Sequence, residues 1–286
     1  METFDADWLA LREPVDHGSR AEALIAPLVD AWQTRGWSRV LDLGSGTGSN
    51  LRYLAPRLPG GQAWVLVDHD LEHLRTLRGL ARPDRVRSLT VSPGDLAAQD
   101  LEEVAGVDLV TASALLDLTS ERWLDRVVTA CSQARCGVLW ALTYNGRIHW
   151  SDQEADDSAA GTVAVAPRDT DPDDRLVQDA VNLHQTGDKG FGPALGPAAG
   201  RVAERRFQAA GYHTTLRDSP WRLAAPDRSI VKRLVDGWEQ AAAAVRPADS
   251  ARIRRWADGR RARVATGRFS LTVGHHDLLA LPPAPR

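Results

Sequence analysis

The stretch Arg39-Val-Leu-Asp-Leu-Gly-Ser-Gly-Thr-Gly-Ser-Asn50 decides the fold of this chain. Its first half, Arg39 to Leu43, is a short apolar run typical of a buried strand. Its second half places Gly44, Gly46 and Gly48 in a G-x-G-x-G spacing. Glycines let a backbone approach a ligand closely, and a helix that follows such a loop offers free N–H groups at its start. The stretch therefore predicts a strand, a ligand-binding loop and a helix, in that order.

The same unit recurs along the first half of the chain. Further strands are predicted at Ala63 to Val67, Val86 to Val91, Val107 to Ala112 and Gly137 to Thr143, with helices near residues 70–80 and over Glu121 to Arg135. Continuously apolar strands separated by helices indicate a parallel sheet that is covered on both faces. We predict a doubly wound α/β fold with a mostly parallel seven-stranded sheet and helices on both faces.

The flanking segments complete this prediction. Ser19-Arg-Ala-Glu22 fits the S-x-x-E capping box and predicts a helix from Ser19 to Gly36. The last third predicts a helix near 198–210, a strand-like run over Tyr212 to Leu223, two helices between roughly 227 and 264, and a strand over Phe269 to Leu281. These two runs are expected to form an antiparallel C-terminal strand pair.

Composition excludes several classes of protein. Of 286 residues, 43% are hydrophobic and 26% charged, and no apolar run approaches the ~20 residues of a membrane helix. The net charge of −3 supplies no global basic field for nucleic acid. Cys131 and Cys136 are too few for a four-cysteine zinc site, and no metal is required. The acidic N-terminus lacks a secretory signal, so we expect a cytoplasmic protein.

The spacing of the glycine loop selects the ligand. The third glycine follows the second by two residues, where a dinucleotide fingerprint has three. Asp42 lies two residues before the loop, and its carboxylate would repel a pyrophosphate. The same carboxylate would suit a ligand that carries an ammonium and a sulfonium charge.

This loop resembles the first motif of the class I S-adenosylmethionine-dependent methyltransferases, an acidic residue followed by x, Gly, x, Gly, x, Gly. The resemblance covers roughly residues 19–145. It implies that S-adenosylmethionine is the cofactor and S-adenosylhomocysteine the product. It places the following residues of the loop at the cofactor: Asp42, Gly44, Ser45, Gly46, Gly48 and Asn50.

Three later motifs occur in the order of that family. An acidic residue at the end of the second strand binds the ribose diol, and Asp68 stands there, followed by His69, which would pack against the adenine. Gly94-Asp95-Leu96 matches the third motif, in which Asp95 and Leu96 would contact the adenine. Thr111-Ala-Ser-Ala-Leu-Leu-Asp117 occupies the place of the loop under the methionine moiety, with Ala112 and Ser113 as contact residues.

The division of the chain follows from these positions. We predict one domain over residues 1–286, with the cofactor-binding half at 38–145 and a C-terminal half at 201–286 that completes the sheet. Residues 1–37 form a helical segment that lies over the cofactor, and Arg12 in it would hold the cofactor carboxylate. Residues 146–200, which include Trp150 and Phe191, form an insertion that we expect to act as a substrate lid.

The catalytic residues are predicted from position alone. Methyl transfer from a sulfonium is an in-line displacement, so the protein mainly aligns donor and acceptor. A hydroxyl acceptor would need a base, for which we predict His184, with His149 as the alternative and Tyr144 lining the acceptor pocket. His275 and His276 alternate on the last strand and are expected at the surface.

The sequence therefore predicts a methyltransferase that acts on a small molecule and has no membrane partner, and a homodimer is one option for its assembly. The motifs typical of base-amine and cytosine methylases are absent. An alternative is a methyltransferase for tRNA or protein, which would use the basic helix residues Arg254, Arg255, Arg260, Arg261 and Arg263. A third possibility is a protein that binds the cofactor without catalysis.

Overall fold

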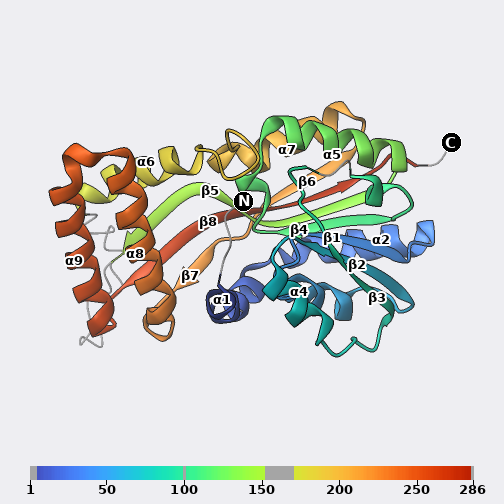
Figure 1. Cartoon of the computed structure of the whole chain (residues 1–286), viewed down its shortest axis with the longest axis horizontal. Coiled ribbons are helices and arrows are strands. Elements are labelled where there is room, and N and C mark those ends of the chain that lie inside the picture. Colours follow the sequence, from blue (N-terminus) through green and yellow to red (C-terminus); the bar gives the residue numbers. More distant parts are fainter. Residues whose placement is uncertain (1–4, 99–100, 152–170, 285–286) are drawn as a thin grey trace, which may run out of the picture.

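An eight-stranded sheet runs through the molecule (Figure 1). The computed structural model describes residues 5–98, 101–151 and 171–284. The strand order is β3-β2-β1-β4-β5-β8-β6, with β7 beside β8. The parallel strands are β1 (Arg39–Leu43), β2 (Gln62–Asp68), β3 (Val86–Pro93), β4 (Leu109–Ser113) and β5 (Gly137–Ser151). The prediction of a mostly parallel sheet is confirmed.

The C-terminal strands close the sheet. The long strand β8 (Ser270–Leu281) lies antiparallel between β5 and the pair β6 (His213–Asp218) and β7 (Trp221–Leu223). The expected antiparallel strand pair is therefore present, and the run Tyr212 to Leu223 is divided into two strands. Since the chain passes from β1 outward to β3 and then returns to β4, the strand order reverses between β1 and β4. Such a reversal leaves a crevice at the carboxyl ends of the two strands.

Helices cover both faces of the sheet, as predicted. In Figure 1, α5 and α7 lie on one face and α2 and α4 on the other. None of the helices in the described part of the chain combines the length and the hydropathy that a membrane crossing requires. The bounds are α1 (Ala6–Ser19), α2 (Ile25–Arg35), α3 (Ser49–Leu54), α4 (Leu71–Arg78), α5 (Glu121–Ala134), α6 (Pro172–Gln185), α7 (Ala199–Ala209), α8 (Arg228–Val245) and α9 (Ser250–Thr266).

The predicted start of the first helix is wrong. Ser19 ends α1 instead of beginning a helix, and no side chain caps the turn at Glu22. The chain is extended at Arg20, whose guanidinium lies 3.5 Å from the carboxylate of Asp277, and the N–H of Ala21 donates to the same carboxylate at 2.9 Å. These long-range contacts with β8 outweigh the local capping signal.

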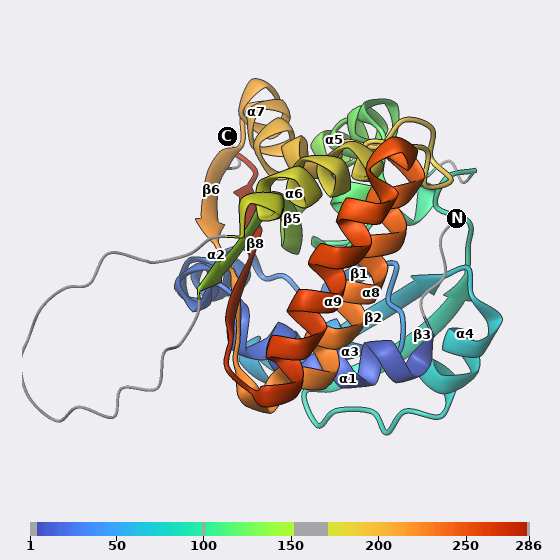
Figure 2. The ribbon, with the colours of Figure 1, turned by 90° about the vertical axis from the view of Figure 1, so that its left-hand side faces the viewer.

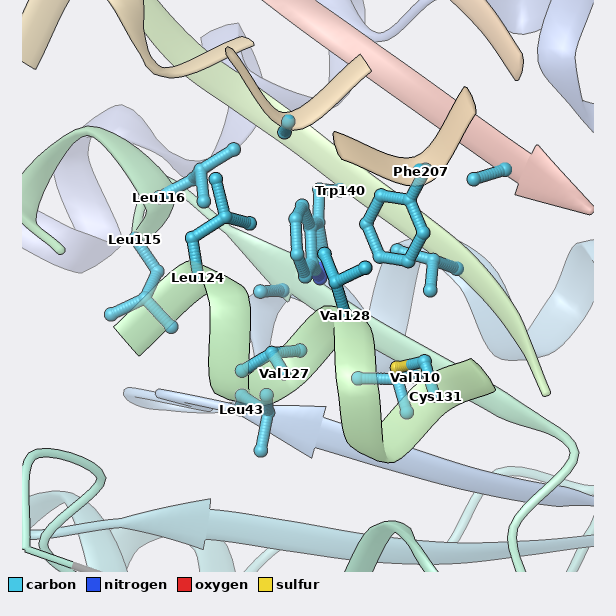
Figure 3. Packing of buried hydrophobic residues seen from close by; sticks show 14 of the residues in the cluster. Leu43, Val110, Leu115, Leu116, Leu124, Val127, Val128, Cys131, Trp140 and Phe207 are labelled. Carbon is cyan, nitrogen blue, oxygen red and sulfur yellow. The ribbon is translucent and has the colours of Figure 1, made fainter. Parts of the chain in front are cut away.

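A buried apolar cluster fixes the central strands (Figure 3). Leu43 of β1 and Val110 of β4 lie beneath α5, and Trp140 of β5 meets Phe207 of α7 edge to face at 5.3 Å. Cys131 belongs to this cluster as a buried free thiol. Burial of each such side chain contributes on the order of 2 kcal/mol. The cluster therefore holds the carboxyl ends of β1 and β4 in place.

A second core lies at the far end of β5 and β8. β5 continues eight residues beyond the predicted end at Thr143 and pairs with β8 as far as Ser151 and Ser270. The helices α6, α8 and α9 pack together against this ribbon, as Figure 2 shows. Part of the predicted insertion thus forms a helical layer, and its acidic stretch 152–170 lies outside the described residues.

Asp174 joins α6 to α9, and we expect its replacement by Ala to destabilise the fold by about 3 kcal/mol. Its carboxylate accepts from Trp256 Nε1 at 2.7 Å and from Arg260 Nη2 at 2.5 Å. Arg260 is only 2% exposed, so Asp174→Ala would remove the carboxylate that two nitrogens of this buried guanidinium contact. Urea unfolding measures the change.

The neighbouring Asp173 provides the matched control. It pairs with Arg252, which is exposed to solvent, so Asp173→Ala is expected to have little effect. Equal losses of stability in the two variants would contradict the assignment of Asp174 as the buried link.

Candidate active site

A cavity opens at the carboxyl ends of β1, β2 and β4, where the strand order reverses. Its wall comes from four parts of the chain: a side of α1, the glycine loop with the start of α3, the end of β2 with α4, and the loop after β4. The lining residues are Leu9, Arg12, Asp16, Gly44, Ser45, Gly46, Thr47, Ser49, Asn50, Asp68, His69, His73, Ser113, Ala114, Leu115 and Leu118.

The glycine loop lies against the end of β2. The N–H of Ser45 donates to the carbonyl oxygen of Val67 at 3.0 Å, and the N–H of Gly46 donates to Asp68 Oδ2 at 2.7 Å. Gly46 has a φ of +53°, and a Cβ built on it would lie 3.2 Å from Leu9 of α1. Side chains at this position would therefore narrow the space between the loop and α1.

The third glycine of the loop, Gly48, is required for packing and not for the cavity wall. Gly48 has a φ of +87° and does not line the cavity, although the sequence predicted a cofactor contact. A Cβ on Gly48 would lie 2.7 Å from Leu80 Cδ1 and 3.1 Å from Leu77 Cδ2. Gly48 thus permits the turn into α3 and the close packing of α4.

Asp68 is the best-defined polar group of the cavity. It is 5% exposed, and its Oδ1 accepts from the N–H of Asp70 at 2.9 Å, while its Oδ2 accepts from Gly46. A carboxylate oxygen can accept two hydrogen bonds, so each oxygen retains capacity for a ligand hydroxyl. These backbone donors fix the orientation of the carboxylate before any ligand binds.

Two histidines flank this carboxylate. The Nδ1 atoms of His69 and His73 lie 3.7 and 3.5 Å from Asp68 Oδ1. His69 Nε2 is buried and has no hydrogen-bond partner among residues 5–98, 101–151 and 171–284. His73 lines the cavity but was not predicted, and its position on the first turn of a helix capped by Asp70 is the signal that could have found it.

Asp42 lies behind the glycine loop and does not line the cavity. It is 1% exposed, and its Oδ1 accepts from Asn50 Nδ2 at 2.7 Å, whereas no group in the described part of the chain donates a hydrogen bond to its Oδ2. Asn50 does line the cavity, and its Oδ1 accepts from Arg20 Nη1 at 3.0 Å. The structure therefore places Asp42 as the anchor of Asn50. Burial raises the pKa of Asp42 to about 7.

This raised pKa predicts a pH-dependent stability. Between the unfolded pKa of Asp42, 3.8, and its folded pKa, about 7, the folded state binds more protons than the unfolded state. The contribution of Asp42 is therefore full at low pH and is lost as the pH rises toward 7, by up to about 4 kcal/mol at about 1.4 kcal/mol per pKa unit. Asp42→Asn removes the dependence.

Urea unfolding of both proteins from pH 4 to 8 tests this expectation. The stability of the native protein relative to Asp42→Asn should fall as the pH rises through this window and become constant above it. Two parallel pH curves would show that Asp42 keeps an ordinary pKa.

Helix α1 lies along one side of the cavity. Glu13 Oε1 accepts a hydrogen bond from Arg52 Nε of α3 at 2.7 Å, and this hydrogen bond lowers the pKa of Glu13. His17 Nε2 lies 3.0 Å from Ser49 Oγ, and Asp16 accepts from Trp221 Nε1 of β7 at 3.0 Å. Arg12, a predicted residue, lines the cavity from α1, and Asp16, which was not predicted, does so beside it.

Three further residues predicted to contact the cofactor lie outside the cavity lining. Asp95 is exposed and accepts from the N–H of Ala97 at 3.0 Å. Leu96 and Ala112 are buried in the apolar core, and the carbonyl oxygen of Leu96 accepts from Trp123 Nε1. The loop after β4 instead contributes Ser113, which was predicted, and Ala114 and Leu115 beyond it. The cofactor contacts of Asp95, Leu96 and Ala112 stay predictions.

The three predicted catalytic side chains are not brought together. Tyr144 is buried, donates from its hydroxyl to Asn182 Oδ1 at 2.9 Å, and has a pKa raised by burial. His149 is exposed on β5. His184 lies on α6 with its Nδ1 3.3 Å from Lys189 Nζ. None of the three lines the cavity.

The expectation that His275 and His276 lie at the surface is wrong. They are 6% and 7% exposed, because β8 is covered by strands on both sides and by helices on both faces. The ring of His275 lies 5.1 Å from that of Trp221 and 6.2 Å from that of Tyr144. Burial, with the nearby charge of Arg12, lowers the pKa of His275 to about 3.

Comparison with known proteins gives one family. Residues 40–134, which span β1 to the end of α5, match a family model described as a methyltransferase domain. No curated protein matches the sequence.

Several solved structures are similar to the chain. The YcgJ protein from Bacillus subtilis has a TM-score of 0.49 at 12% identity, with 92% of this chain and 99% of that chain covered. A putative sarcosine dimethylglycine methyltransferase from Galdieria sulphuraria has a TM-score of 0.43 at 16% identity, with coverage of 92% and 85%. A methyltransferase from Thiobacillus denitrificans, in complex with S-adenosylhomocysteine, has a TM-score of 0.43 at 15% identity, with coverage of 97% and 99%.

The matched family model covers the strands and loops that form the cavity. It includes the glycine loop at 44–48 and the end of β2 at Asp68, which carry the motifs of the sequence. Residues 40–134 therefore match a methyltransferase domain, and they include the loop and the carboxylate on which the family resemblance rests.

Proposed function

We propose that the chain is an S-adenosylmethionine-dependent methyltransferase that acts on a small-molecule acceptor in the cavity beside α1. The observation that carries the proposal is that α1 forms one wall of the cavity, through Leu9, Arg12 and Asp16. Hydrogen bonds from α3 and β7 hold this helix in place. A macromolecular substrate would have to displace this helix to reach the end of β4. A small molecule requires much less opening.

The cavity residues fit S-adenosylmethionine. The two oriented oxygens of Asp68 match the vicinal hydroxyls of a ribose, as the sequence motif predicts. His69 lines the cavity, and its buried Nε2, which has no partner in the part of the chain that the structure describes, offers a further polar contact. Gly44 and Gly46 leave backbone exposed to the cavity because neither carries a side chain.

The cofactor, when bound, supplies a methyl group activated by a positively charged sulfur. The chain's own residues then bind and orient: Asp68 fixes the cofactor, and the apolar side chains of Leu9, Leu115 and Leu118 exclude water from the cavity. Alignment of this kind accounts for much of the catalysis of a displacement reaction. His184 and His149 stay predictions as the base, and Tyr144 stays a prediction as a residue of the acceptor pocket. The proposal does not depend on them.

The alternative prediction, a tRNA or protein substrate, depended on the arginines of α9. Arg260 is buried against Asp174, and Arg261 pairs with Asp236, Glu239 and Asp258. Two of the five predicted arginines are therefore occupied by carboxylates, whereas Arg254, Arg255 and Arg263 are exposed. This arrangement favours the small-molecule acceptor.

Label transfer distinguishes these substrates. The enzyme is incubated with S-adenosylmethionine labelled in its methyl group and with a cell extract that ultrafiltration has divided into small molecules and macromolecules. We expect enzyme-dependent label in the small-molecule fraction alone. Label in RNA or protein would overturn the proposal, and cofactor binding without transfer to either fraction would favour a non-catalytic protein.

A further inference from the structure

Helix α1 carries an ion pair at the wall of the cavity. Arg12 Nε donates to Asp16 Oδ2 at 2.8 Å and Arg12 Nη2 donates to Asp16 Oδ1 at 3.1 Å. Both side chains are 11% exposed, and both residues line the cavity. We propose that this pair binds the amino-acid end of S-adenosylmethionine, an inference that rests on the proposed function.

The pair retains unused hydrogen-bonding capacity. Arg12 donates to Asp16 through Nε and Nη2, and its Nη1 has no hydrogen-bond acceptor among the described residues. Asp16 Oδ1 accepts twice, from Arg12 and from Trp221 Nε1, whereas Asp16 Oδ2 accepts only once. One donor group and one acceptor position thus remain.

Their surroundings hold the pair in place. The guanidinium of Arg12 lies 4.8 Å from the ring centre of Trp221 and 5.9 Å from that of Trp8. Such stacking, together with the two hydrogen bonds to Asp16, restricts the rotamers of both side chains. A ligand therefore meets groups that are already ordered, which reduces the entropy lost on binding.

The chemistry of the pair matches an amino acid. A free carboxylate would accept from Arg12 Nη1 in a charge-assisted hydrogen bond, and a free ammonium would donate to Asp16 Oδ2. The pair has no net charge, as does the amino-acid group of the cofactor. In the sequence, Arg12 alone was predicted to hold the carboxylate, and the structure adds Asp16, one helical turn later, for the ammonium.

Calorimetry with two ligands tests the inference. S-adenosylhomocysteine carries the amino-acid end, whereas 5′-methylthioadenosine keeps the adenosine and sulfur but lacks it. Arg12→Met, which keeps a long apolar side chain beside the two tryptophans, is expected to weaken S-adenosylhomocysteine about 10- to 100-fold. The affinity for 5′-methylthioadenosine should not change. Asp16→Asn, which can still accept from Trp221, should show the same pattern with a loss of about tenfold.

Arg233→Met is the matched control. Arg233 also lies over Trp8, at 5.8 Å, but it pairs with Asp5 and does not line the cavity. This variant should bind both ligands like the native protein. Equal losses for both ligands in Arg12→Met and Asp16→Asn, or no loss for either, would overturn the inference. A native protein that binds neither ligand would instead contradict the proposed function.

Discussion

Replacement of Asp68 by Ala is expected to weaken S-adenosylhomocysteine at least about 100-fold, because two charge-assisted hydrogen bonds of about 1.5–3 kcal/mol each are lost. The loss of affinity has a second cause, which is the loss of contacts between Asp68 and the backbone of the protein. Gly46 N–H and Asp70 N–H both donate to this carboxylate, so its removal also frees the glycine loop from the end of β2. Calorimetric titration measures the change in Kd.

Asp30→Ala is the matched control for this prediction. Asp30 is an exposed aspartate of α2 and lies outside the cavity lining. We expect an effect on the Kd of less than about tenfold. Thermal unfolding checks that Asp68→Ala is folded, and Asp68→Asn, which keeps the shape of the side chain, replaces it where it is not. An unchanged Kd in a folded Asp68 variant would exclude the assigned ribose site.

Replacement of Asp277 by Ala is expected to destabilise the fold by about 4 kcal/mol. Asp277 is 2% exposed, and its Oδ1 accepts from the N–H of Leu142 at 2.8 Å and from Ser219 Oγ at 2.6 Å. Its Oδ2 accepts from the N–H of Ala21 at 2.9 Å and lies 3.5 Å from Arg20 Nε. Asp277→Ala would leave several buried donors and one buried cation without this partner. Urea unfolding measures the loss.

Asp218→Ala is the control for Asp277. Asp218 lies on β6, faces His276 at 3.4 Å and has a largely exposed side chain, so little loss is expected. Ser219→Ala removes only one of the donors and should cost about 1 kcal/mol, which gives a measurable variant where Asp277→Ala does not fold. A loss in Asp277→Ala no larger than that in Asp218→Ala would contradict the buried role.

The sequence predicted those parts of the site that depend on residues close together in the chain. The strand Arg39–Leu43, its glycine loop and Asp68 follow from apolar runs and turn residues only a few positions apart. The family resemblance added the cofactor, and the sheet order agreed with it. These features depend on short stretches of chain, so the sequence contains nearly all the information that they require.

Long-range contacts determine what the sequence did not predict. Ser19 ends a helix because Asp277, more than 250 positions later, binds the chain at Arg20 and Ala21. His275 is buried because β5 continues past Thr143 on one side of β8 and Trp221 of β7 lies on the other, and no local pattern marks that extension. Asp16 reaches the cavity because Trp221 positions α1. Each outcome depends on pairs of residues that only the folded chain brings together.

One titration tests the central claim, that this cavity binds S-adenosylmethionine. The purified protein is titrated calorimetrically with S-adenosylhomocysteine, with NAD in a parallel experiment. We expect one S-adenosylhomocysteine to bind per chain with a Kd in the micromolar range, on the order of −8 kcal/mol, and no binding of NAD. Binding of NAD alone would show that the glycine loop holds a pyrophosphate, and the account of the site would be wrong.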